Sequence, residues 1–149
     1  MAKILLIEDD QRIRELVCEH LASEGHSVSS ESTGMQGLQK ATSEKPDLII
    51  LDLGLPDLEG IDLLKMLRSV NNIPVLVLTA REEEDVVLAA FDGGADDYVV
   101  KPVSGPQLSA RIAALLRRAD TAKTEKIVVS GLEIELGPRL ATIDGKPMD

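Results

Sequence analysis

Short strand-like runs alternate with segments of helical spacing along most of this chain. The strand-like runs begin near Lys3, Ser27, Leu48, Pro74 and Asp97. Each is followed by a helix-period segment, so the pattern is a βα unit repeated five times. This alternation predicts an α/β fold, a doubly wound parallel sheet of five strands with five helices on its two faces.

The pattern also predicts strand positions and helix ends. Residues 48–51 and 75–78 are apolar without alternation, as expected for central strands covered on both faces, whereas HSVSSES is polar and should form an edge strand. Asp10 directly precedes the first helix and suits its N-cap better than a ligand role. That helix should stop before Gly25, and the last should begin near Ser104.

The pattern changes after Arg118. Residues 119–126 are polar without periodicity and indicate a linker that follows a first domain at 1–118. Residues 127–149 show short alternating runs with an Asp144-Gly145 turn signal. Because this segment is too short to bury its own core, we expect it to be the first sheet of an incomplete second domain.

Composition narrows the possible partners. The 149 residues are 44% hydrophobic with a net charge of -10, which argues against nonspecific binding to nucleic acid or anionic membranes. Recognition of a phosphate would therefore need a metal ion. The single Cys18 excludes an internal disulfide, and no apolar stretch reaches the roughly 18 residues of a membrane span, so we expect a soluble, cytoplasmic protein.

Four apolar runs end on polar residues, and the carboxyl ends of parallel strands share one sheet edge, where open α/β folds bind ligands. Asp52 ends the run PDLIILD, and a carboxylate there needs a partner or a task. Alone it is equally consistent with a helix N-cap. The other three ends add Glu8, Asp9 and Asp10, Thr79 and Ala80, and Lys101.

These residue types together favour phosphoryl chemistry. Glu8, Asp9 and Asp52 would repel one another unless a cation intervened, and Mg²⁺ accepts one or two protein carboxylates while bridging to phosphoryl oxygens. Lys101 and Thr79 can bind a phosphoryl group, and Ala80 leaves space for it. The arrangement predicts that Asp52 attacks phosphorus to form an aspartyl phosphate.

The chain resembles the receiver domain of bacterial two-component response regulators of the OmpR/PhoB transcription-factor family. The matching strings are ILLIEDD, PDLIILDLGLPDLEG, VLVLTA and GADDYVVKP, which cover roughly residues 1 to 118. The segment DLGLPD is particularly similar to the corresponding segment of KdpE regulators. The resemblance implies a flavodoxin-like sheet of order 2-1-3-4-5. It also implies that residues 127–149 begin a winged-helix effector domain, so that DNA binding belongs to helices outside this sequence.

The resemblance also implies roles for individual residues. Asp52 is the expected phosphoacceptor, and Asp9 with Asp52 would bind Mg²⁺ directly, for which Mn²⁺ can substitute. Glu8 would act largely through water, and the main-chain carbonyl of Gly54 would complete the protein ligands. Thr79 is the expected switch hydroxyl, Tyr98 the expected switch aromatic, and Lys101 the expected partner of the phosphoryl group. The peptide bond between Lys101 and Pro102 is commonly cis in this family.

A sensor histidine kinase and a second copy of the chain are the implied partners. Phosphorylation would favour a homodimer through the fourth helix, fifth strand and fifth helix, with Asp97 paired to Arg111 and Asp96 to Arg118 across the interface. Leu88 and Gln107 stand where many relatives have a basic residue and a glutamate. A smaller, more apolar contact is therefore expected.

Three rival functions remain open. A phosphatase of the haloacid-dehalogenase kind needs a second acid two residues after its nucleophile, where this chain has Gly54. A flavodoxin-like cofactor binder needs a neutral phosphate loop after the first strand, where this chain has EDD. A stand-alone receiver adaptor is disfavoured by the strand-like segment at 127–149.

Overall fold

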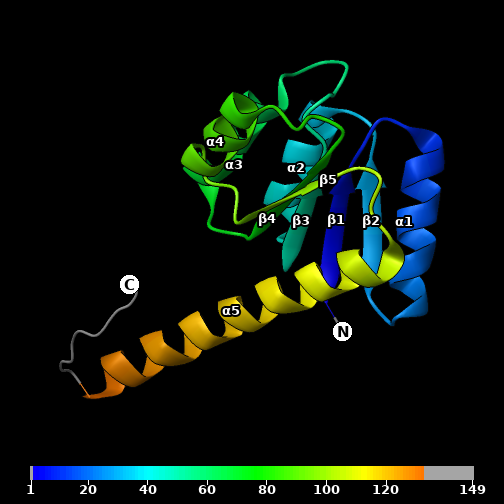
Figure 1. Ribbon diagram of the computed structural model, residues 1–149. Coiled ribbons are helices and arrows are strands. Elements are labelled where there is room, and N and C mark those ends of the chain that lie inside the picture. Colours follow the sequence, from blue (N-terminus) through cyan, green and yellow to red (C-terminus); the bar gives the residue numbers. More distant parts are fainter. Residues whose placement is uncertain (1, 133–149) are drawn as a thin grey trace. The chain divides into compact units, whose positions relative to one another are not determined.

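The computed structural model describes residues 2–132, with burial and side-chain contacts through Ala119, and contains one parallel sheet (Figure 1). The strands lie in the order β2-β1-β3-β4-β5. Their bounds are β1 (Lys3–Ile7), β2 (Ser27–Glu31), β3 (Leu48–Leu51), β4 (Val75–Thr79) and β5 (Asp97–Val100). The predicted α/β fold, strand order and polar edge strand are confirmed.

Five helices cover both faces of the sheet: α1 (Gln11–Ser23), α2 (Gly34–Glu44), α3 (Gly60–Val70), α4 (Glu84–Asp92) and α5 (Gly105–Leu132). The strands are buried on both faces, so alternate residues serve two separate cores. Leu5 and Ile7 pack with residues of α2, α3 and α4, whereas Ile4 and Leu6 pack with residues of α1 and α5. Figure 1 shows the same division of helices between the faces.

Local capping explains where the first helix begins and ends. The Asp10 carboxylate accepts hydrogen bonds from the backbone N–H groups of Arg12 and Ile13 at 2.9 and 3.3 Å, which confirms it as the N-cap of α1. After Ser23 the chain turns through Gly25, whose φ of 92° is easily reached only by glycine. The predicted stop before Gly25 is therefore confirmed.

The segment after Arg118 differs from the prediction. A linker is predicted at 119–126 and a sheet from 127, but α5 continues without interruption to Leu132. The segment lacks apolar periodicity, yet its alanine, lysine and glutamate residues favour helix, and no glycine or proline intervenes before Gly131. Backbone contacts divide the chain into units at residues 1–116 and 117–149. The effector sheet is predicted at 127–149, and residues 133–149 of it lie outside the described residues.

None of the helices within residues 2–132 combines the length and the hydropathy that a membrane span requires.

Candidate functional site

The parallel sheet brings the predicted polar residues to one edge. Asp52 follows β3, and its N–H donates to the Ile7 carbonyl at 3.0 Å, so it lies next to Glu8 at the end of β1. Lys101 follows β5, and its N–H donates to the Thr79 carbonyl of β4 at 2.8 Å. Backbone pairing alone therefore aligns these four strand ends.

Lys101 links two of the strands through its side chain. Its Nζ lies 2.7 Å from Glu8 Oε1 and 3.2 Å from Asp52 Oδ2. Glu8 is 1% exposed and Asp52 8% exposed, so both carboxylates are largely removed from water. A buried carboxylate is stable only with partners, and Lys101 supplies one for both.

The titration of these groups reflects crowding as well as pairing. Burial raises the pKa of Glu8 to about 7; the neighbouring Asp52 adds to the rise, and the hydrogen bond from Lys101 opposes it. Burial would also raise the pKa of Asp52, but the Gly54 N–H and the Lys101 charge outweigh it and lower that pKa. The pKa of Lys101 is raised, because Glu8 and Asp52 more than offset its burial. The cluster thus has more acid than its lysine can neutralise.

The excess of acid fits a small, hard cation. Carboxylate oxygens of Glu8, Asp9 and Asp52 lie within 4.8 Å of one another. Asp9 is exposed, so the cluster is open to solvent on that side, as Mg²⁺ requires because it retains several waters. These three residues are chemically suited to hold Mg²⁺. The Gly54 carbonyl as a further ligand stays a prediction.

The two expected phosphoryl contacts on β4 also lie at this edge. Thr79 is buried, its hydroxyl helps to lower the pKa of Asp52, and it accepts a 3.5 Å hydrogen bond from the Arg81 N–H. Ala80 is exposed. A hydroxyl beside the carboxylate and a small side chain next to it leave both a donor and room for a phosphoryl group.

Tyr98 connects this edge to the surface of α4. Its hydroxyl donates to the Arg81 carbonyl at 2.7 Å, and its ring centroid lies 6.3 Å from that of Phe91. Arg81 is also the residue whose N–H donates to Thr79. Thr79 and Tyr98 therefore contact the same residue, so movement of one can be felt by the other. Their switching role remains a prediction.

Three of the residues expected at a dimer interface form ion pairs within the single chain. Arg111 Nη1 lies 3.1 Å from Asp97 Oδ2. Asp96 binds Arg68 at 2.9 Å, although Arg118 was its expected partner across an interface. Leu88 is 60% exposed on α4, as a contact residue would be. A dimer that used the predicted pairs would have to exchange these internal contacts for intermolecular ones.

Two structural residues near the site were not predicted. Arg14 Nη1 donates to the main-chain carbonyls of Glu8 and Asp9 at 2.9 and 3.0 Å, and so fixes the loop that presents both acids. Asp57 joins the loop after Asp52 to the start of α2. Arg14 follows Glu8 and Asp9 by six and five residues, so its contact is local in the sequence. The partners of Asp57 are more than twenty residues away in sequence, and no local pattern indicates them.

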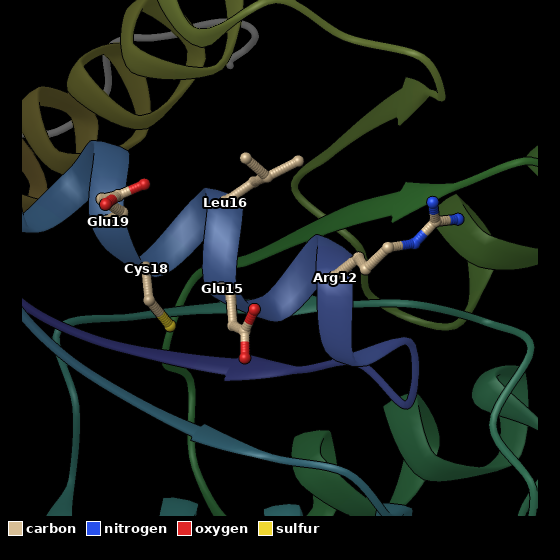
Figure 2. A pocket seen from close by; sticks show the side chains of 5 residues that line it. All are labelled: Arg12, Glu15, Leu16, Cys18 and Glu19. Carbon is tan, nitrogen blue, oxygen red and sulfur yellow. The ribbon is translucent and has the colours of Figure 1, made fainter.

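A surface pocket on α1 lies apart from this chemistry (Figure 2). It is lined by Arg12, Glu15, Leu16, Cys18 and Glu19, all from that one helix. None of the strand-end residues lines it. The carboxylate cluster, and not this pocket, is therefore the candidate reaction site.

Known proteins with similar sequences are regulators. The response regulator receiver domain family matches residues 4–113. The transcriptional regulatory protein AfsQ1 of Streptomyces coelicolor is 38% identical over 148 residues, which cover 99% of this chain and 66% of AfsQ1. The KDP operon transcriptional regulatory protein KdpE of Escherichia coli is 43% identical over 142 residues, which cover 94% of this chain and 63% of KdpE. The chain thus spans about two thirds of the length of these relatives.

Solved structures agree with the sequence match. A CheY-like receiver domain protein from Methanospirillum hungatei superposes with a TM-score of 0.80 at 28% identity, covering 82% of this chain and 98% of that one. The BeF3-activated receiver domain of RstA from Klebsiella pneumoniae gives a TM-score of 0.74 at 31% identity, covering 77% of this chain and 98% of its own. Since the family match spans most of the sequence, the chain belongs to the response regulator receiver family, and the relatives it matches are OmpR/PhoB-type transcriptional regulators.

Proposed function

We propose that Asp52 accepts a phosphoryl group from a sensor histidine kinase. The carboxylate oxygen attacks phosphorus, and the phosphorus–nitrogen bond of the phosphohistidine breaks, leaving its electron pair on the imidazole. The observation that most supports this role is Lys101 Nζ, 3.2 Å from the nucleophile and 2.7 Å from Glu8. A fixed cation beside the acceptor favours charge that develops on the transferred oxygens.

Metal binding completes the proposed site. Asp9 and Asp52 would hold Mg²⁺ directly, with Mn²⁺ as a substitute, and Glu8 would act mainly through water. Mg²⁺ held by these residues would supply positive charge to the transferred phosphoryl group. Thr79 offers its hydroxyl, and Ala80 leaves space at the same edge. These residues would assist phosphorylation of Asp52 and the later hydrolysis of its aspartyl phosphate, which returns the carboxylate and releases phosphate, so the protein is a regulator and not an enzyme acting on external substrates.

Regulation would follow from the added charge. A phosphoryl group brings about 1.5 to 2 negative charges, which shift the preferred positions of Thr79 and Tyr98. Complete reversal of a two-state preference needs roughly 5.5 kcal/mol, so several contacts must change together. The surface of α4, β5 and α5 would then favour a homodimer. Control of transcription in the cytoplasm through a DNA-binding domain would then depend on this dimer.

Phosphorylation by a small donor tests the proposal. Acetyl phosphate with Mg²⁺ should add one phosphoryl group to the wild-type chain, as measured by intact mass, and should add none to Asp52→Asn. The beryllofluoride complex should promote association in sedimentation velocity. Equal labelling of Asp52→Asn would contradict the acceptor, and an activated monomer would contradict only the dimer. If the wild-type chain stayed monomeric after activation, the alternative function of a stand-alone receiver adaptor would be favoured.

A further inference from the structure

The loop at residues 53–59, here called the β3 loop, connects the phosphoacceptor to α3 and is closed at its base. The Gly60 N–H donates to the Leu53 carbonyl at 3.0 Å, and Gly54 pairs with Glu59 in an antiparallel bridge. A Cβ on residue 60 would collide with the Leu53 Cα, so glycine permits this closure. The closed base holds Gly54 beside Asp52, where the Gly54 N–H donates to Oδ1 at 3.2 Å.

The tip of the β3 loop is attached to a different element. Asp57 Oδ1 accepts a hydrogen bond from the Gly34 N–H at 2.7 Å, and Oδ2 accepts one from the Met35 N–H at 3.0 Å. These are the first two residues of α2, whose N–H groups have no partner within the helix. The carboxylate charge also suits the positive end of the helix dipole.

Packing reinforces this attachment. A Cβ on Gly34 would lie 2.9 Å from Leu58 Cδ1 and 3.2 Å from Leu58 Cβ, so the helix start and the loop tip are in close contact. The helix also has its own N-cap, because Thr33 Oγ1 accepts from the Gln36 N–H at 3.3 Å. Asp57 therefore bonds N–H groups that the cap leaves free, and these bonds join α2 to the β3 loop.

We infer that Asp57 is a positioning residue for the phosphorylation site. By fastening the β3 loop to α2, it holds Gly54 in the place where its N–H contacts Asp52 and its carbonyl can face the metal. The metal part of this inference rests on the proposed function, whereas the anchor rests on the contacts alone. Without the anchor, the loop would spend less time in the competent arrangement, and apparent metal affinity would fall by that fraction.

Calorimetric titration of the full 149-residue chain with Mg²⁺ tests the inference. Asp57→Ala should weaken Mg²⁺ binding by about fivefold, because affinity falls in proportion to the population of the binding-competent loop, here taken as about one fifth. Asp57→Asn retains an acceptor oxygen, so its Mg²⁺ affinity should lie between those of the wild type and Asp57→Ala. Gly34→Ala should also weaken binding, because its methyl group would push Leu58 from the opposite side of the same contact.

Thr33→Ala is the matched control. It removes the α2 cap at the same helix end without touching the β3 loop, so it should lower the melting temperature and leave Mg²⁺ affinity unchanged. Hydrogen exchange without metal gives a second readout: amides at residues 53–60 should exchange faster in Asp57→Ala than in Thr33→Ala.

Two results would overturn the inference. One is an Mg²⁺ affinity of Asp57→Ala equal to wild type, and the other is an equal loss in Thr33→Ala, which would make the effect one of general stability. A wild type that binds Mg²⁺ but takes no phosphoryl group would contradict the proposed function alone. A wild type that binds no Mg²⁺ would contradict both the metal assignment and the positioning role.

Discussion

The two edges of the sheet each hold a cation that contacts carboxylates, and their charge balance differs. At the carboxyl edge Lys101 faces Glu8 and Asp52, with Asp9 close by. At the amino edge Arg68 binds a single carboxylate, that of Asp96.

The amino edge is also satisfied in its hydrogen bonds. Arg68 donates to the main-chain carbonyls of Gly94 and Asn71 as well as to Asp96, and Asp96 accepts a 2.8 Å hydrogen bond from the Val75 N–H. Charge and donors are therefore matched there, and the edge joins α3, β4 and the start of β5. The carboxyl edge retains excess acid. A polar cluster with matched charges stabilises the fold, whereas a cluster with excess carboxylates is suited to bind a cation.

Removing the cation of the carboxyl edge should have the largest effect on phosphorylation. Lys101→Met keeps the aliphatic stem but loses the charge beside Asp52. We expect the rate of labelling by acetyl phosphate to fall about 100-fold, as for loss of a fixed transition-state donor. Intact mass against time measures the rate. Lys65→Met, on the exposed side of α3, should leave it unchanged, and an unaltered rate in Lys101→Met would refute the role of this lysine.

Removing the cation of the amino edge should lower the free energy of unfolding and leave the phosphorylation rate unchanged. Arg68→Ala removes three hydrogen bonds and leaves Asp96 without its cation, so we expect the free energy of unfolding to fall by about 2 to 3 kcal/mol. Urea titration measures the loss. The labelling rate of the folded protein should be unchanged; a large drop in that rate would show that the two edges are coupled. Arg12→Ala, at an exposed position on α1, is the control and should leave the free energy of unfolding unchanged.

Removing one carboxylate tests whether Asp9 binds the metal ion itself or only adds negative charge. Asp9→Asn should weaken Mg²⁺ binding by at least about tenfold, since even indirect partners of a metal are worth that much. Calorimetry measures the change. Asp10→Asn makes the same substitution one residue further on, and asparagine retains the N-cap of α1, so its Mg²⁺ affinity should match wild type. Equal losses in the two variants would mean that general charge, and not ligation by Asp9, controls binding.

The smallest effect is expected on the surface of α4, β5 and α5. In the proposed dimer Arg111 exchanges its internal pair with Asp97 for an intermolecular one. Arg111→Ala removes that exposed intermolecular pair, worth about 0.2 to 1 kcal/mol, so the dissociation constant of the beryllofluoride-activated dimer should rise about 1.4-fold to fivefold for each pair. Sedimentation equilibrium measures it. The difference from wild type should disappear at high salt, where exposed ion pairs are screened. A complete loss of dimer would show that this pair supplies affinity as well as register.

The sequence predicted the strand ends well because apolar runs stop where the sheet edge begins. Asp52, Glu8, Thr79 and Lys101 lie together because parallel pairing leaves few other arrangements.

Two features could not be predicted in this way. The helical continuation of α5 to Leu132 depends on propensity without an apolar stripe, so periodicity does not detect it. The attachment of Asp57 depends on the position of α2 in space, and an aspartate after proline indicates only a turn.

Chemical mapping of the phosphorylated residue tests whether Asp52 is the phosphoacceptor. The wild-type chain is treated with acetyl phosphate and Mg²⁺, reduced with borohydride so that an acyl phosphate becomes an alcohol, and digested for sequencing by mass spectrometry. We predict homoserine at position 52 and unmodified Glu8 and Asp9. Reduction at either of those two acids, or no reduction at position 52, would contradict the account.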